Sequence, residues 1–212
     1  MRTRIKICGL TREADVDMAV AAGADAIGFV LYERSPRHVA VARAAELARR
    51  LPPFVTPVLL TVNASPALIR EALAAVPHAL LQFHGDESPS QCAAPARPYL
   101  RAARMAPGFD LLDFALRFRG AHALLLDAHV ESYGGGGKAF DWSLIPPSVP
   151  LPVVLSGGLN AANVIDGVCR VRPWAVDVSS GVESSKGIKD AELMRRFCDA
   201  VREADARVAA TA

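Results

Sequence analysis

Two side chains suited to proton transfer stand at the ends of apolar stretches in this sequence. Cys8 follows Ile5-Lys6-Ile7, and Asp127 closes the run 123–126. A thiol whose pKa is lowered, here by Lys6 or by a helix N-terminus, works as a proton acceptor, and an aspartic acid can protonate a leaving oxygen. Each residue also has a plainer interpretation. Free cysteines are commonly buried as small apolar residues, and strand-end aspartates commonly cap backbone N–H groups.

Two glycine-containing groups, Ser156-Gly157-Gly158 and Ser179-Ser180-Gly181, follow later apolar stretches. Glycine lets backbone N–H groups approach an anion, and a helix N-terminus adds a favourable dipole. A helix capped by Asn160 is expected after the first group, and a short extra helical turn at Val182-Glu183 after the second. We expect phosphate contacts from Gly157, Gly158, Ser180 and Gly181. The alternative is that the glycines only make tight turns.

Three more polar residues follow apolar stretches or lie within them. Arg37 has the fork geometry that pairs with a carboxylate, although by itself it reads as an exposed loop residue. His84 suits a hydrogen-bonded structural role as well as a ligand contact. Asp177 lies inside an apolar stretch, where a charge needs a partner, so it is either structural or a ligand contact. The run Gly134–Gly137 before Lys138 is expected to be a mobile lid or a ligand loop.

These residues fall within an alternation of apolar β-type stretches and segments with helical periodicity. Strands are expected near 4–8, 26–30, 58–62, 79–83, 99–103, 123–127, 153–155 and 175–178. Continuous apolar strands between amphipathic helices imply a parallel sheet covered by helices. A doubly wound open sheet would share this pattern. The length and the count near eight favour an α/β fold, a single-domain (β/α)8 TIM barrel over residues 1–212, in which polar residues after the strands converge on one face.

Capping residues give the expected starts of the helices. They are Thr11 for a helix over 12–22, Ser65 with Pro66, Ser88 with Gln91 as a capping box, Asn160, and Asp190 for the last helix. In the first helix, Ala14, Met18, Ala21 and Ala22 are expected to face the core. Trp142 and Trp174 are also expected in the core.

Composition narrows the class of protein. The 212 residues are 51% apolar and 22% charged, as in soluble globular domains, and the net charge of +2 is too small to indicate nucleic acid or an anionic membrane. The four cysteines form no C-x-x-C pair and no zinc spacing, so no metal site is predicted. Scattered thiols without a signal-peptide pattern or a membrane-length apolar run predict a cytoplasmic protein.

Taken together, the motifs resemble the phosphoribosylanthranilate isomerase family of tryptophan biosynthesis over nearly the whole chain. The motifs are Lys6–Thr11, Ser35–Arg37, Gln82–Gly85, Leu126-Asp127, Gly134–Lys138 with Phe140–Trp142, Leu155–Leu159, Asp177–Glu183 and Gly187–Asp190. Two residues depart from the family pattern. Gly136 stands where the family usually has threonine, and Phe83 where it usually has leucine, and neither change removes a catalytic group.

The resemblance implies a cofactor-free Amadori rearrangement on a (β/α)8 barrel. The substrate would be N-(5′-phosphoribosyl)anthranilate and the product 1-(2-carboxyphenylamino)-1-deoxyribulose 5-phosphate. Cys8 matches the general base and Asp127 the general acid. Arg37 matches the position that holds the anthranilate carboxylate, and backbone groups near Gly158 and Gly181 match the phosphate site. The expected partner is this phosphorylated small molecule, with no nucleic acid or membrane, and the expected state is a monomer or a weak homodimer.

Two alternatives stay open at this point. The histidine-pathway isomerase performs the same rearrangement, but that family resembles a duplicated half-barrel with aspartate where this chain has Cys8, and no such half-repeat is visible here. The other alternative is a catalytically silent barrel that binds a phosphorylated metabolite or a partner protein. A turnover assay separates the silent barrel from the enzyme.

Overall fold

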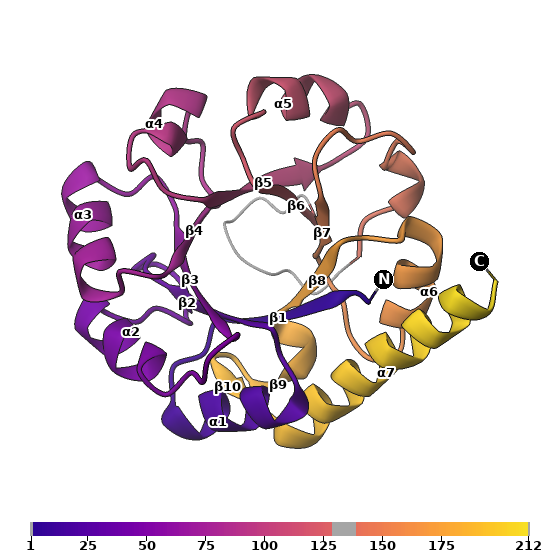
Figure 1. Ribbon diagram of the computed structural model, residues 1–212, viewed down its shortest axis with the longest axis horizontal. Helices are drawn as coiled ribbons and strands as arrows, with labels where there is room; N and C mark the ends of the chain where they lie inside the picture. The colour runs from indigo at the N-terminus through magenta and orange to yellow at the C-terminus, as the bar shows by residue number, and fades with distance from the viewer. Residues whose placement is uncertain (1, 129–138, 212) are drawn as a thin grey trace.

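The computed structural model describes residues 2–128 and 139–211. Eight parallel strands close into a barrel in chain order, with β8 pairing to β1 (Figure 1). The strands are β1 (Arg4–Cys8), β2 (Ala26–Val30), β3 (Thr56–Thr61), β4 (Leu80–Phe83), β5 (Tyr99–Met105), β6 (Ala123–Ala128), β7 (Val153–Leu155) and β8 (Ala175–Val178). The predicted closed barrel is confirmed, and the open sheet is wrong.

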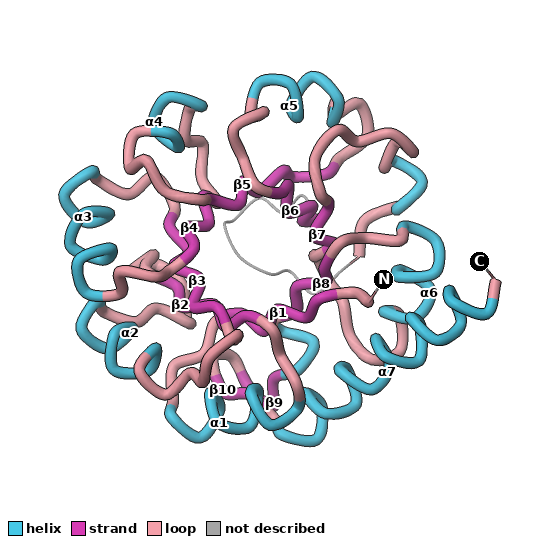
Figure 2. The backbone as a smooth tube through the Cα atoms, viewed as in Figure 1, coloured by secondary structure: helices cyan, strands magenta, loops and turns pink. Residues whose placement is uncertain are grey.

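Helices surround the ring of strands (Figure 2). They are α1 (Glu13–Ala22), α2 (Val41–Ala48), α3 (Pro66–Ala75), α4 (Pro89–Ala93), α5 (Leu111–Arg117), α6 (Val164–Val171) and α7 (Ala191–Ala210). A 3-10 turn, η1 (Trp142–Leu144), precedes β7. A second one, η2 (Ser180–Val182), follows β8. The predicted extra turn at Val182-Glu183 therefore exists but begins two residues earlier, and Glu183 instead starts β9 (Glu183–Ser185), which pairs antiparallel with β10 (Ile188–Lys189).

Three of the predicted helix caps are present. The Ser65 side chain accepts a hydrogen bond from the backbone N–H of Leu68, with Pro66 in the first turn. Ser88 and Gln91 make both hydrogen bonds of the capping box. Asp190 accepts from the backbone N–H of Leu193. These helix starts are therefore determined by local sequence.

Two predicted caps are wrong. Arg12 stands at the N-cap of α1, and the hydroxyl of Thr11 instead donates to the carbonyl oxygen of Gly187 at 3.0 Å. The N-cap of α6 is Asn163, and Asn160 uses its side-chain oxygen to accept from the backbone N–H of Ala162. In the first case a distant loop takes the hydroxyl, and in the second a turn precedes the helix, so local spacing is misleading.

The predicted core face of α1 is only half correct, because Met18 and Ala22 pack against the core but Ala14 and Ala21 do not. Asp15, Val16 and Ala19 are the buried residues of this helix, whereas Ala14 and Ala21 are exposed. The Asp15 carboxylate accepts from the backbone N–H of Lys189 at 3.2 Å and from the Arg12 guanidinium, which satisfies it inside the fold. A run rich in alanine has little hydrophobic contrast, so this buried carboxylate determines the rotation of the helix.

Of the two tryptophans, Trp142 is partly buried against the core, but Trp174 is 41% exposed. Trp174 directly precedes β8, at the amino end of the barrel. The Arg4 guanidinium lies 3.7 Å from the centroid of its ring. A cation–π contact at the rim thus replaces the predicted core position.

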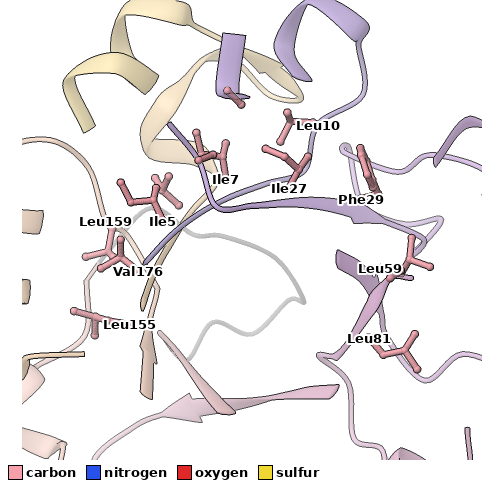
Figure 3. Close-up of a cluster of buried hydrophobic side chains, with 14 of the residues drawn as sticks. Ile5, Ile7, Leu10, Ile27, Phe29, Leu59, Leu81, Leu155, Leu159 and Val176 are labelled. Atoms are coloured by element: carbon pink, nitrogen blue, oxygen red, sulfur yellow. The ribbon is translucent and has the colours of Figure 1, made fainter. Parts of the chain in front are cut away.

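The alternation of side chains along each strand determines which residues face the helices and which face the inside of the barrel. Outward-facing residues pack under the helices, as Figure 3 shows for Ile5, Ile7, Ile27, Phe29 and others. Inward-facing residues lower in the ring form a separate apolar cluster that includes Val58, Leu125, Val154 and Ala175. Since inward positions repeat every second residue, Asp127, Ser156 and Asp177 stand directly above this cluster. No helix in the described parts of the chain is both long and apolar enough to span a bilayer.

Candidate active site

A pocket opens at the carboxyl ends of the barrel strands, with about 700 Å³ of empty space that is partly open to solvent. The described residues that line it are Cys8, Val30, Tyr32, Ser35, Arg37, Leu60, Val62, Gln82, His84, Asp127, Ser156, Gly157, Gly158, Leu159, Asp177, Ser179 and Ser180. The structure therefore brings together all the predicted site residues except Gly181, which is not part of the lining and packs against Leu159. The run Gly134–Gly137 and Lys138 lie outside the described residues.

Cys8 ends β1 directly beside Gly28 of β2, its partner in register. A Cβ atom added at Gly28 would lie 2.5 Å from the Cys8 Sγ and 3.1 Å from its Cα. The missing side chain therefore creates the space that the sulfur occupies. The Cys8 side chain packs with Val30 and Leu60, which gives one wall of the pocket an apolar surface.

Burial raises the pKa of the Cys8 thiol above its ordinary value. The Lys6 ammonium opposes this shift, Asp177 adds to it, and Lys189 opposes it weakly. Lys6 thus acts on the thiol pKa in the predicted direction, but removal of the sulfur from water outweighs it. At neutral pH the resting side chain is mainly a neutral thiol.

We expect alkylation of Cys8 by iodoacetamide to accelerate with pH well into the alkaline range, because the thiolate is the nucleophile and its pKa is raised. Mass spectrometry of quenched samples separates Cys8 from Cys92 and Cys198, whose thiols are buried and have pKa values of about 11. A Cys8→Ser variant provides the blank. A rate plateau below about pH 8, under the ordinary thiol pKa of roughly 8.5, would contradict this expectation.

Lys6 and Asp177 form a buried ion pair across β1 and β8. The Lys6 Nζ lies 2.8 Å from the Asp177 Oδ1, and the Ser156 hydroxyl donates to Oδ2 at 3.4 Å. Burial by itself would lower the pKa of Lys6, but Asp177 and then Cys8 outweigh it, so the net shift is upward and Lys6 stays protonated. Asp177 therefore has the partner that its position requires, and it also lines the pocket.

Asp127 and His84 make direct contact inside the pocket. The Asp127 Oδ2 lies 3.1 Å from the His84 Nε2, and its Oδ1 accepts from the backbone N–H of Ala128 at 2.9 Å. A Cβ atom at Gly157, where φ is +78°, would lie 2.9 Å from Oδ1 and 2.5 Å from the Ala128 nitrogen. Gly157 is thus required for the close approach of this loop to Asp127.

Arg37 is buried, so its interpretation as an exposed loop residue is wrong. Its Nε and Nη2 donate to the two carboxylate oxygens of Glu183 at 2.7 and 2.8 Å. Lys189 adds a 2.8 Å ion pair to the same carboxylate. Burial opposes ionisation of Glu183, but Arg37 and Lys189 outweigh it and hold the pKa of this carboxyl below its usual range. The fork of Arg37 is therefore already paired, and Nη1 has no hydrogen bond to the described residues.

The loops after β7 and β8 pack directly on one another. Gly158 has a φ of +67°, and a Cβ atom at Gly181 would collide with the carbonyl oxygen of Leu159. Gly158 and Ser180 line the pocket. These glycines thus make tight turns, as the alternative interpretation expects. The same turns leave the backbone of both loops beside the pocket.

The sequence of residues 5–200 matches the family model described as N-(5′-phosphoribosyl)anthranilate (PRA) isomerase. The chain belongs to this isomerase family. A phosphoribosylanthranilate isomerase from Leptothrix cholodnii is 75% identical over 206 residues, covering 97% of this chain and 94% of that protein. One from Methylibium petroleiphilum is 74% identical over 211 residues, covering 100% and 99%.

Solved phosphoribosylanthranilate isomerases share the fold. The Thermotoga maritima structure is 40% identical, with a TM-score of 0.88 over 95% of this chain and 99% of that one. Another, solved in complex with reduced 1-(o-carboxyphenylamino)-1-deoxyribulose 5-phosphate, is 36% identical, with a TM-score of 0.84 and the same coverage. The predicted family, fold and isomerase function in tryptophan biosynthesis are therefore confirmed. The roles of individual residues stay predictions.

Sequence patterns do not identify Glu183 or Lys189 as neighbours of Arg37, since 146 residues separate Arg37 from Glu183. Gln82 is different, because a signal for it exists. It is the single polar residue of its strand, two positions before His84, so strand alternation places both side chains on the same face. Among the described residues, no cluster of three or more His, Cys, Asp or Glu side chains could hold a metal ion.

Proposed function

We propose that this pocket converts N-(5′-phosphoribosyl)anthranilate to 1-(2-carboxyphenylamino)-1-deoxyribulose 5-phosphate, with Cys8 as general base and Asp127 as general acid. The observation that carries this assignment is that both groups line one pocket, from β1 and β6, with β7 and β8 between these strands in the ring (Figure 1). A substrate held between two such groups can lose a proton on one side and gain one on the other.

In the first step, Asp127 gives its proton to the ribose ring oxygen. The bond from that oxygen to C1′ breaks, and the nitrogen lone pair forms a C=N⁺ bond, which gives a protonated Schiff base. Cys8 first loses its own thiol proton to solvent and then, as the thiolate, removes the proton from C2′. The electron pair of that C–H bond forms C1′=C2′ and neutralises the nitrogen. The resulting enolamine tautomerises to the ketone. The positive charges of Lys6 and of the protonated Schiff base both favour the thiolate form of Cys8 during proton removal from C2′.

The remaining residues would hold the substrate. Nη1 of Arg37 is placed to receive the anthranilate carboxylate, while Glu183 holds the rest of the guanidinium. The apolar wall of Val30 and Leu60 suits the aromatic ring. Phosphate contacts would come from Gly157, Gly158, Ser180 and Gly181, and ribose contacts from His84 and Asp177. The protein would act in the cytoplasm as one domain, a monomer or weak homodimer, without a cofactor.

The direct test adds purified protein to phosphoribosylanthranilate made in situ and follows the fluorescence of the anthranilate group. Catalysis predicts a change that is faster with protein and proportional to its concentration. A protein that binds the reduced product analogue but gives no turnover would instead be the silent barrel.

Arg37→Met is expected to raise KM by roughly 10- to 100-fold, because it removes a charge-assisted hydrogen bond of about 1.5–3 kcal/mol, with little change in kcat. Steady-state kinetics measure both constants in one preparation. Arg34→Met, at an exposed position of the same loop, is the matched control. An unchanged KM in Arg37→Met would show that Arg37 only ties Glu183 in place.

The reduced product analogue should raise the melting temperature, because it binds only the folded state. At a concentration of 100 times Kd, linkage gives about 2.7 kcal/mol. For a chain of this length that corresponds to a shift of roughly 5–10 °C. Scanning calorimetry of the wild type is compared with Ser180→Asp, in which a second negative charge opposes the phosphate. The same shift in both proteins would place the phosphate elsewhere.

A further inference from the structure

Gln82 is a fully buried polar residue of β4 in the floor of the pocket. Its amide nitrogen lies 3.0 Å from the Nδ1 of His84. Its amide oxygen is buried as well and has no hydrogen-bond partner in the described chain. A buried amide with one end unsatisfied lowers the free energy of unfolding, so its position beside His84 points to a role in the pocket.

The contact with Gln82 determines which nitrogen of His84 carries a proton. When the Gln82 NH₂ donates to Nδ1, that nitrogen holds a lone pair, and the neutral ring carries its proton on Nε2. Nε2 then donates to the Asp127 Oδ2 at 3.1 Å, and the backbone N–H of Ala128 donates to Oδ1. Asp127 is surrounded by donors in this arrangement, which suits the carboxylate and not the acid.

Turning the Gln82 amide by 180° reverses this arrangement. Its oxygen would then accept from a protonated Nδ1, and its nitrogen would become the unpartnered atom. With Nδ1 protonated, the proton on the Nε2···Oδ2 hydrogen bond can rest on Asp127, which makes it a carboxylic acid. Either orientation leaves one end of the amide without a partner among the described residues, so turning it reverses the hydrogen bond to His84 without losing one.

We propose that Gln82 is the positioning residue of the acid step, setting through His84 whether Asp127 holds a carboxylate or the proton that it donates. The proton count balances. Going from the carboxylate form to the acid form takes up one proton from solvent at Nδ1, while the Nε2 proton passes to Oδ2. The acid then gives that proton to the ribose ring oxygen. This inference rests on the proposed role of Asp127.

Two variants and one control test this role. Gln82→Met keeps the volume but removes both hydrogen-bonding ends, and Gln82→Glu supplies an acceptor only. The control is Thr61→Val in the adjacent β3, because Thr61 is also buried with an unpartnered hydroxyl oxygen. The neighbours of Thr61, Leu60 and Val62, line the pocket, so strand alternation turns Thr61 away from it.

The first readout is ¹⁵N NMR of His84, assigned with a His84→Asn blank. In wild type without ligand, Nδ1 should give the lone-pair signal and Nε2 the N–H signal, because the structure places the Gln82 amide nitrogen beside Nδ1. Gln82→Met should show exchange between both tautomers, and Gln82→Glu should shift Nδ1 to its protonated form. Thr61→Val should match wild type. Unchanged His84 signals in both Gln82 variants would overturn the proposal whatever their activity.

The second readout separates kcat from KM. Gln82→Met should lower kcat at least roughly fivefold, the value of one hydrogen bond of about 1 kcal/mol, with KM unchanged. Gln82→Glu should recover most of that loss. Equal kcat in wild type and Gln82→Met would overturn the positioning role. If instead Asp127→Asn kept its activity, the proposed function would fail, a separate result that leaves the NMR outcome intact.

Discussion

Asp127→Asn is expected to lower kcat by roughly 10²–10⁴-fold while the barrel stays folded, since general acids contribute about this much. Asparagine has nearly the same shape as aspartate, and its amide oxygen can still accept from the backbone N–H of Ala128. It has no carboxylic proton, however, so ring opening loses its proton donor. Steady-state kinetics, circular dichroism and binding of the reduced product analogue are measured on the same preparation.

The matched control is Asp166→Asn, the same chemical change at an exposed position of α6, where Asp166 pairs with Arg170. An exposed helix pair contributes only about 0.3–0.5 kcal/mol, so this variant should keep full activity. If Asp127→Asn also stayed active with an intact circular dichroism spectrum, another group would have to supply the proton.

Cys8→Ser should reduce kcat by at least a similar factor, about 10²–10⁴-fold. Serine fits the space beside Gly28, so collapse of the fold is not expected. Its hydroxyl has a far higher pKa than a thiol, and the Lys6 ammonium that helps to stabilise a thiolate cannot bring it into a working range. The proton on C2′ then has no acceptor. Binding of the product analogue should persist, because the hydroxyl removes no substrate contact.

Cys169→Ser on α6 is the control for this change, because Cys169 is partly exposed and lies away from the pocket. Near-normal kcat in Cys8→Ser would show that the sulfur is only a small buried residue. If Cys8→Ser and Asp127→Asn both kept normal kcat with intact structure, the acid–base mechanism itself would be wrong.

The barrel could be predicted from the sequence because its strands carry strong local signals. The boundaries of β1, β2, β7 and β8 agree with the apolar stretches, and Ser65, Ser88 and Asp190 start their helices as local capping rules require. The errors occur where a distant contact takes over. The Thr11 hydroxyl binds Gly187 and the buried Asp15 binds Lys189, and no pattern within α1 shows either partner.

The residues of the site could be predicted where they follow a strand, because a parallel barrel places the carboxyl ends of all its strands at one face. Cys8, His84, Asp127 and Asp177 converge for that reason. The pairing of Arg37 with Glu183 joins segments with no shared local signal. The raised pKa of Cys8 depends on how completely the sulfur is removed from water, which a charge pattern around Lys6 does not reveal.

The sizes of the residues at positions 8 and 28 depend on each other. Because its absent side chain is the room for the Cys8 sulfur, a larger residue at 28 is tolerated only with a smaller one at 8. A smaller residue at 8 in turn leaves a void that a larger residue at 28 could fill. Glycine is already the smallest residue, however, so no substitution at 28 can make room at 8 for a proton acceptor larger than cysteine.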